Sequence, residues 1–256
     1  MTQPQILHGW LTLHWDIDSI IRFLGRKSDS SAARNGLKPT DQSSSFFRNT
    51  IETTLHQSNA ATAALLGSSP TVIRPRRLRL ASAKDLYSIG RLVQGLADFE
   101  KEPDAVNVTP EHYQIDGFQS DPPLFYCILI EVSTTEKNDN INDWYACGMA
   151  FCWIGSRQDV SHTTSRMIQQ PESLFLYLED LFIEEGYRGN GAGTFVMTTL
   201  GEIALSLNCN KMVWQALDWN TPALTFYQNK IGARIVDGLL TTRFAGPALH
   251  EFHNFE

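Results

Sequence analysis

The stretch Tyr187-Arg188-Gly189-Asn190-Gly191-Ala192-Gly193 follows an apolar, β-prone run from Leu174 to Ile183. Helical periodicity begins near Thr194, so the stretch is predicted to join a strand to the start of a helix. The first N–H groups of a helix have no partner inside it, and the helix dipole favours negative charge there. The three glycines let the main chain approach a ligand closely. The pattern therefore predicts an anion site, and the expected anion is a phosphate or pyrophosphate.

The spacing of the glycines separates this loop from two other phosphate-binding loops. No Gly-Lys-Ser/Thr follows the last glycine, as a P-loop requires. The glycines at 189, 191 and 193 also do not fit the Gly-x-Gly-x-x-Gly pattern of dinucleotide-binding folds. The pattern that fits is Arg-x-x-Gly-x-Gly, read as Arg188, Gly191 and Gly193. Taken alone, a glycine turn before a helix can also be simple chain punctuation.

Segments on both sides of the loop show strand and helix patterns. Upstream, antiparallel hairpins are predicted, and downstream a strand–helix–strand–helix–strand series. Together these elements predict an α/β (α+β) fold with a mixed, mostly antiparallel central sheet and helices on both faces. The predicted strands are 78–80, 124–132, 144–154, 174–183, 211–217, 233–236 and 241–244, and the predicted helices are 84–99, 110–117, 194–207 and 221–230.

The first 70 residues differ in composition from the rest of the chain. Residues 28–45 are rich in Ser, Asn, Gly and charge, which predicts a flexible segment. Apolar residues between Trp10 and Leu24 recur at helical spacing, and residues 60–66 predict another helical turn or two. We therefore predict an N-terminal extension over 1–70, partly disordered with short helices, and one domain over 71–256. The extension shows no chemistry, and a docking segment is one interpretation of its first helix.

The bulk composition of the 256 residues is that of a globular protein, with 42% hydrophobic residues and a net charge of −7. The acidic excess disfavours nucleic acid as the main partner. Four cysteines without a Cys-x-x-Cys pair, and the lack of a signal peptide, predict reduced thiols in a cytoplasmic protein. No apolar run is long enough to span a membrane, and the scattered histidines indicate no metal site.

Further segments extend the pattern of the glycine-rich loop, and they do so in a fixed order along the chain. They are Leu178-Glu179-Asp180-Leu181-Phe182-Ile183, Asp218-Trp219-Asn220 with Ala223 and Phe226-Tyr227, Gly232-Ala233, and Arg243-Phe244-Ala245-Gly246-Pro247-Ala248-Leu249. Together they resemble the GNAT superfamily of N-acetyltransferases. Within it they resemble the diamine branch, which includes the spermidine/spermine and thialysine acetyltransferases. The end of the first predicted helix, Leu96 to Glu100, resembles that branch as well, and the resemblance covers about residues 72–249.

The resemblance implies transfer of an acetyl group from acetyl-CoA to a primary amine of a polyamine, a diamine or a lysine- or ornithine-like amino acid. Direct attack is expected, since no cysteine lies inside a matched segment to serve as nucleophile. A homodimer is also implied. The residues that the resemblance assigns to the coenzyme are Leu181, Phe182, Ile183, Arg188, Gly189, Asn190, Gly191, Ala192, Gly193, Asn220 and Tyr227.

The resemblance also assigns the proton transfers and the acidic end of the substrate pocket. A substrate ammonium, with a pKa of about 10.4, must lose a proton before it attacks. Glu179 matches the position that accepts this proton, and Tyr227 is the expected general acid for the departing thiolate. Glu179 and Asp180 are expected to point to opposite faces of their strand, so that only one faces the reaction centre. The substrate-binding residues are predicted to be Glu100, Asp104, Glu179 and Asp180.

Two departures from the family pattern concern the substrate pocket. The segment from Tyr227 to Gly232 is one residue longer than the family pattern, and the aromatic residue expected before Arg243 is missing.

A basic run at Arg74, Arg76, Arg77 and Arg79 can contact phosphates, contact a partner or form a solvated strand edge. The acceptor can also be a protein N-terminus or lysine. A non-catalytic acyl-CoA-binding protein is the remaining alternative.

Overall fold

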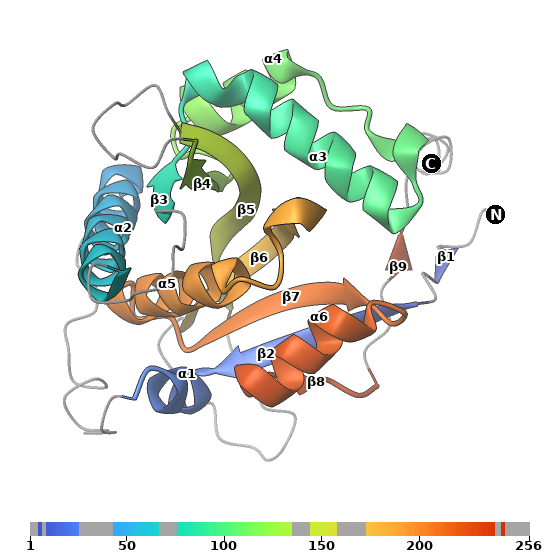
Figure 1. Cartoon of the computed structure of the whole chain (residues 1–256). Coiled ribbons are helices and arrows are strands. Elements are labelled where there is room, and N and C mark those ends of the chain that lie inside the picture. Colours follow the sequence, from blue (N-terminus) through green and yellow to red (C-terminus); the bar gives the residue numbers. More distant parts are fainter. Residues whose placement is uncertain are drawn as a thin grey trace, which may run out of the picture. The chain divides into compact units, whose positions relative to one another are not determined.

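The computed structural model of the chain describes residues 5–6, 9–25, 43–66, 76–134, 144–157, 173–238 and 242–243. The chain divides into two compact units, whose elements Figure 1 colours along the sequence. The larger unit comprises residues 29–212, and the smaller unit combines residues 1–28 with 213–256. Residues of the first 70 contribute to both units, and the division into an extension over 1–70 and a domain over 71–256 stays a prediction.

Four strands of the larger unit follow the order β3-β4-β5-β6, and each is antiparallel to its neighbour. All four overlap the segments predicted for them. β5 continues three residues past its predicted end at residue 154. Residues 158–172 lie outside the described residues. The strands are β3 (Arg76–Leu80), β4 (Tyr126–Ser133), β5 (Trp144–Arg157) and β6 (Ser173–Ile183).

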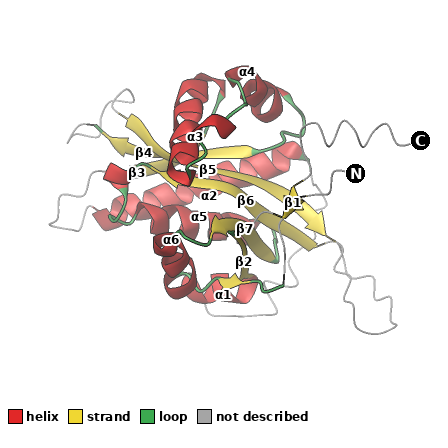
Figure 2. Ribbon diagram, turned by 90° about the vertical axis from the view of Figure 1, so that its right-hand side faces the viewer, coloured by secondary structure: helices red, strands yellow, loops and turns green. Residues whose placement is uncertain are grey.

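Helices cover both faces of these strands (Figure 2). The strand β4 explains why, because all of its residues are buried and successive side chains of a strand point to opposite faces. On one face lie α3 (Leu86–Glu100) and α4 (Pro110–Tyr113), and on the other α2 (Ser44–Leu66) and α5 (Ala192–Ser206). The unit also contains short helical turns at Ala83–Asp85, Pro103–Ala105, Gln114–Gln119 and Glu185–Tyr187.

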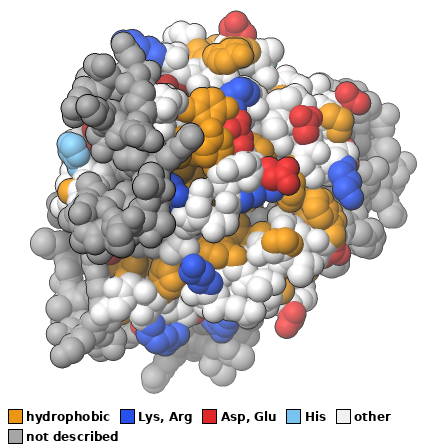
Figure 3. Space-filling view, in the orientation of Figure 1, with side chains coloured by type: hydrophobic (Ala, Val, Ile, Leu, Met, Phe, Trp, Pro, Cys, Tyr) orange, Lys and Arg blue, Asp and Glu red, His pale blue; other side chains and the backbone are white. Residues whose placement is uncertain are grey.

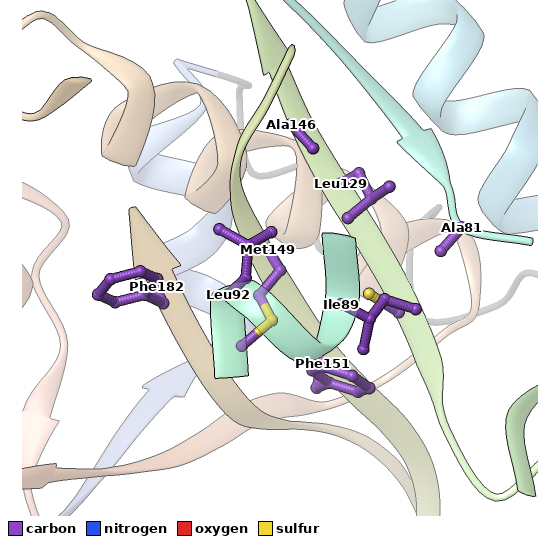
Figure 4. Close-up of a cluster of buried hydrophobic side chains, with 9 residues drawn as sticks. Ala81, Ile89, Leu92, Leu129, Ala146, Met149, Phe151 and Phe182 are labelled. Atoms are coloured by element: carbon purple, nitrogen blue, oxygen red, sulfur yellow. The ribbon is translucent and has the colours of Figure 1, made fainter. Parts of the chain in front are cut away.

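The helix α3 packs its apolar side against the strands β4, β5 and β6 (Figure 4). Ile89 and Leu92, three residues apart, are fully buried there against residues that include Leu129 and Met149. Burying a side chain of this size contributes about 1.5–3 kcal/mol. Ser82 caps the short turn Ala83–Asp85 that leads into α3, and its backbone N–H donates to a carboxylate oxygen of Asp85 at 2.8 Å.

The helix α2 belongs to the larger unit, although it lies within the predicted extension. Ile51 and Leu55, one turn apart, are buried, and residues 60–66 form the end of this 23-residue helix. Asn59 bonds the backbone of Leu78 on β3 twice. Its Nδ2 donates to the Leu78 carbonyl at 2.7 Å, and its Oδ1 accepts from the Leu78 N–H at 2.8 Å. The side chain thus pairs with β3 as a neighbouring strand would, which tethers α2 to the sheet.

In the smaller unit, β2 (Trp10–Asp16) lies between β7 (Lys211–Leu217) and β8 (Arg234–Ile235). The helix predicted from Trp10 is therefore wrong over its first half. The reason is tertiary, since Leu13 and Trp15 alternate into a buried face and β2 pairs antiparallel with β8. The other elements of this unit are α1 (Ile17–Phe23), α6 (Thr221–Thr225), a π-helical turn at Phe226–Lys230, and the pair β1 (Gln5–Ile6) and β9 (Thr242–Arg243).

Candidate functional site

The glycine-rich loop leads directly into α5, as its sequence predicts. Gly189 and Gly191 have φ angles of +74° and +90°, which L side chains rarely adopt. Gly191 is the N-cap of α5, and it offers no side chain to accept from the N–H groups of the first turn. The first turn also contains no acidic residue. The loop and the start of α5 at Ala192 and Gly193 therefore present backbone donors and the positive end of a helix dipole.

Arg76 places a positive charge against this loop. Its Nη1 donates to the carbonyl oxygen of Asn190 at 2.6 Å. A Cβ built on Gly191 would lie 3.7 Å from the same nitrogen, so a side chain there would crowd the arginine. Burial lowers the pKa of Arg76, but its guanidinium remains charged at neutral pH. The other described arginines of the basic run, Arg77 and Arg79, pair with Glu131 instead, and Arg74 lies outside the described residues.

Arg188 is held across the larger unit by its own contacts. Its Nε donates to the carbonyl oxygen of Ile183 at 2.7 Å. Its guanidinium carbon lies 4.9 Å from the ring centroid of Phe99 and 5.6 Å from that of Phe182. These contacts join the end of α3, the end of β6 and the loop. Arg188 therefore stabilises the position of the loop through these contacts within the protein.

A second cluster, which the sequence did not reveal, fixes the chain between β6 and the loop. The Glu184 carboxylate pairs with Arg91 of α3 and accepts from the hydroxyl of Tyr145 at 3.0 Å. The Glu184 N–H donates to the Cys147 carbonyl at 2.9 Å, and Nη2 of Arg91 donates to the Ala146 carbonyl at 2.5 Å. Arg91 and Glu184 are 93 positions apart, so no local pattern could have paired them.

A β-bulge in β6 changes where Glu179 and Asp180 point. Phe151 of β5 pairs with Asp180 and Cys152 pairs with Leu178, which leaves Glu179 as an extra residue without a partner on β5. An extra residue interrupts the alternation of side chains, and bulges frequently reorient a side chain at a functional site. The strict alternation on which the expectation of opposite faces rested therefore does not hold here, and the bulge sets Asp180 opposite Phe151. After burial, the charges of both carboxylates raise the pKa of Tyr177.

Three predicted acidic residues gather here, from β6 and from the end of α3. Burial, together with the charges of Glu179 and Glu100, raises the pKa of Asp180 to about 7. Burial also raises the pKa of Glu100, with a contribution from Glu102. Figure 3 shows acidic side chains over the region of α3 on the face in view. Asp104 occupies an exposed position in the turn after α3. The cluster attracts a cation, and Asp180 can exchange a proton near neutral pH.

Aromatic side chains that the sequence did not single out border these carboxylates. Trp153 stacks on Tyr177 with ring centroids 4.9 Å apart, and it meets Phe175 edge to face at 5.5 Å. Its Nε1 donates to the Glu179 carboxylate at 3.4 Å. The pKa of Tyr113 is raised by burial and then by the charge of Asp180. Aromatic faces attract cations, so these rings and the carboxylates favour the same kind of ligand.

The end of β6 carries Leu181, Phe182 and Ile183, whose role was predicted for the backbone. Leu181 pairs with Ala150, and Ile183 with Gly148. The Phe182 side chain belongs to the core under α3 (Figure 4). Coenzyme binding by this backbone stays a prediction.

The smaller unit carries the remaining predicted residues, Asn220 and Tyr227. The Asn220 side chain caps α6, since its Oδ1 accepts from the N–H of Ala223 at 3.4 Å. Tyr227 is 8% exposed, and its ring meets Trp214 edge to face at 5.1 Å. Burial raises the pKa of the Tyr227 phenol to about 12. The residues from 226 form a π-helical turn, which accommodates the extra residue before Gly232 by closing a wider ring of the backbone.

Other features of the described part of the chain lie apart from these residues or give no site. Two cavities of about 380 and 280 Å³ border α2. Across the described ranges, no group of His, Cys, Asp and Glu side chains is arranged to hold a metal ion. None of the helices in those ranges combines the length and apolar character that crossing a membrane requires.

Comparison with known proteins identifies similar chains. The sequence profile of the Acetyltransferase (GNAT) family matches residues 96–233. A thialysine N-epsilon-acetyltransferase of Mus musculus is 29% identical over 182 residues, which cover 68% of this chain and 95% of the relative. The spermidine/spermine N(1)-acetyltransferase-like protein 1 of Homo sapiens is 30% identical over 60% of this chain and 20% of its own length. An L-ornithine N5-acetyltransferase of Arabidopsis thaliana is 34% identical over 73 residues, which cover 28% of this chain and 32% of the relative.

Proposed function

The chain belongs to the GNAT family of N-acetyltransferases, and we propose that it transfers the acetyl group of acetyl-CoA to a primary amine of a small cationic substrate. One observation carries this proposal. The bulge of β6 gathers three carboxylates and several aromatic rings, and the same strand continues into the glycine-rich loop at the start of α5. A single strand thus connects a place that attracts a cation with a place that attracts an anion.

The loop supports the assignment of the donor. The pyrophosphate of acetyl-CoA would accept from backbone N–H groups at Gly191 to Gly193, with the charge of Arg76 beside them. Because Arg76 also donates to the Asn190 carbonyl, it fixes the loop as well as attracting the phosphates. Arg76 would thus both attract the phosphates and hold the loop in position, which favours this loop as the coenzyme site.

The acidic cluster supports a cationic acceptor. Glu179 and Glu100 lie close enough to Asp180 for their charges to add to the effect of burial on its pKa, and an ammonium ion would relieve this repulsion. The relatives are named for thialysine, ornithine and spermidine or spermine, all of which carry primary amines. We therefore propose a polyamine, a diamine or a lysine- or ornithine-like amino acid as the acceptor.

The proton transfers follow from the chemistry of amide formation. The substrate ammonium gives a proton to a carboxylate of the cluster, with Glu179 as the proposed acceptor and Asp180 as its neighbour. The neutral amine nitrogen then attacks the thioester carbon, the C–N bond forms and the C–S bond breaks. The departing thiolate takes a proton, for which Tyr227 is the proposed donor, and the proton that the nitrogen still has to lose restores the Tyr227 phenol by way of solvent. The products are the acetylated amine and free coenzyme A.

The cysteines support direct attack by the amine. All four are buried, and burial raises the pKa of Cys147 to about 11 and that of Cys152 and Cys209 to about 12. Burial also raises the pKa of Cys127. A thiol with such a pKa is protonated at neutral pH and is a poor nucleophile. An acetyl-cysteine intermediate is therefore disfavoured.

The test is the release of free thiol from acetyl-CoA in the presence of diamines, polyamines, basic amino acids and peptides. We expect release with at least one small diamine, polyamine or basic amino acid, and little with peptides. Release only with peptides would favour a protein acceptor instead. Binding of acetyl-CoA without release for any acceptor would overturn the proposal in favour of a non-catalytic acyl-CoA-binding protein.

A further inference from the structure

Residues 9–16, which comprise Gly9 and the strand β2, are hydrogen-bonded to the chain on both sides of the helical segment that carries Tyr227. On the side before the segment, the carbonyl oxygen of Gly9 accepts from the N–H of Asp218 at 2.6 Å. Asp218 lies two residues before Asn220, whose side chain caps α6. The start of the helical segment is therefore attached to the N-terminal end of β2.

The chain that follows the helical segment is also hydrogen-bonded to β2. The Ala233 N–H donates to the Tyr227 carbonyl at 2.9 Å, and the chain then enters β8. In β8, Ile235 pairs with Leu13, and the Val236 N–H donates to the Thr12 carbonyl at 2.9 Å. The residues from 221 to 232 are thus held between two attachments to one strand.

The ring of Tyr227 is fixed by the neighbouring strand. It meets the Trp214 ring edge to face, and Trp214 belongs to β7, which lies next to β2 in the sheet order. Leu13 and Trp15 of β2 are fully buried, so β2 is part of the core of the smaller unit. Its removal would take away a central strand and both attachments together.

We propose that residues 9–16 position the Tyr227 side chain for acetyl transfer. This inference rests on the proposed function, in which Tyr227 is the general acid. The family profile matches residues 96–233, so the strand that would position this acid comes from a part of the chain before the match. A general acid contributes only when it reaches the proton acceptor, and small displacements of a reacting group lower the rate steeply.

Two glycine substitutions separate positioning from general destabilisation. Gly9 and Gly25 both have positive φ angles, +90° and +65°, so alanine strains the backbone at either site. A Cβ at Gly9 would lie 3.4 Å from Oδ1 of Asp218, and the strained residue supplies the carbonyl that Asp218 bonds. A Cβ at Gly25 would meet nothing within 4 Å. Gly25→Ala is therefore the matched control for Gly9→Ala.

The expected result is a loss of turnover for Gly9→Ala only. We expect kcat to fall about tenfold, within the range that a general acid contributes, while the KM for acetyl-CoA stays unchanged. In a Tyr227→Phe background, Gly9→Ala should cause no further loss, because the group that it displaces is already absent. An equal loss in both backgrounds, or an equal loss for Gly25→Ala, would overturn the proposal.

A titration makes the test independent of catalysis. The Tyr227 phenol is isolated as the difference in tyrosinate absorbance between a protein and its Tyr227→Phe counterpart. If β2 holds Tyr227 in its buried place, Gly9→Ala should lower the phenol pKa from about 12 toward its ordinary value, and Gly25→Ala should leave it unchanged. An unchanged titration in Gly9→Ala would contradict the positioning role. Full turnover of Tyr227→Phe would instead refute the acid role alone, and the titration would still decide the positioning.

Discussion

Arg76 donates a hydrogen bond from Nη1 to the backbone carbonyl of Asn190, and so joins the first residue of β3 to a loop that lies 114 positions further along the chain. The contact leaves one guanidinium beside the uncapped start of α5. Local sequence does not reveal this relationship, because Arg76 is one of several similar arginines in its run. The environment of the glycine-rich loop thus combines its local backbone geometry with the charge of Arg76, which is distant in the sequence.

The first prediction concerns this arginine. Arg76→Gln keeps a donor for the Asn190 carbonyl but removes the charge, so it should weaken acetyl-CoA binding about tenfold, which corresponds to about 1.4 kcal/mol. The kcat at saturating acetyl-CoA should change little. Isothermal titration and steady-state kinetics measure both quantities, and Lys84→Gln, at an exposed position, is the control. Unchanged affinity would remove Arg76 from the coenzyme site.

The second prediction concerns the proton acceptor. Turnover should fall as the pH is lowered through about 7, because Asp180 becomes protonated there and the cluster loses negative charge. Asp180→Asn should move or abolish this acidic limb, whereas Glu179→Gln should lower the rate while the limb remains. If the limb instead disappears in Glu179→Gln and persists in Asp180→Asn, the titration belongs to Glu179. The substrate amine titrates far above the pH of this acidic limb, with a pKa of about 10.4.

The third prediction concerns stability and uses the same shift. The pKa of Asp180 is raised on folding from 3.8 to about 7, so the folded protein binds more protons than the unfolded chain between these values. Folding stability should therefore fall as the pH rises from about 4 to about 7, by at most about 4 kcal/mol for this group. Asp180→Asn should flatten this dependence in urea denaturation measured at several pH values. An unchanged slope would show that the carboxyl titrates alike in both states.

The fourth prediction contrasts a buried and an exposed ion pair. Glu131 is 3% exposed and accepts from both Arg77 and Arg79, at 2.6 and 2.8 Å. Glu131→Gln should lower the free energy of unfolding by about 3 kcal/mol, because the partly buried Arg77 guanidinium loses its counterion and Arg79 keeps only Asp85. Arg234→Ala removes an exposed pair with Asp16 and should cost less than about 1 kcal/mol. Chemical denaturation tests both, and similar losses would contradict the assigned role of burial.

The fifth prediction concerns the general acid. Tyr227→Phe keeps the ring against Trp214 and removes only the phenol, so kcat should fall about 100-fold while acetyl-CoA binding is preserved. Tyr87→Phe is a matched control, because Tyr87 is 83% exposed and should not affect turnover. Near-normal kcat for Tyr227→Phe would leave the thiolate to take its proton from solvent.

Much of the fold could be predicted where the signal is local. The predicted segments for β4, α3 and β7 overlap the observed elements, because strand alternation and helical periodicity repeat within a few residues. The prediction failed for residues 10–16. Their apolar spacing fits a helix, but they form a strand because they pair with β8 and lie between two strands of the sheet.

The candidate site divides in the same way. Glycines before a helix and the residues Glu179 and Asp180 could be found from the sequence, because their types and order are visible in it. The bulge that interrupts the alternation at these two carboxylates could not, since it depends on the register between β5 and β6. The pair of Arg91 and Glu184 was hidden for the same reason.

By itself, the sequence determined the order of the main strands and helices from β3 to β8, the glycine-rich start of α5 and the residues that resemble an acetyl-transfer site. These features depend on backbone preferences and side-chain types over short stretches. Only the tertiary structure decided that β2 joins the smaller unit, that α2 pairs with β3 through Asn59, and that Arg76 meets the loop. Those contacts join residues far apart in the chain, and they form because folding buries apolar faces and pairs the polar groups left beside them.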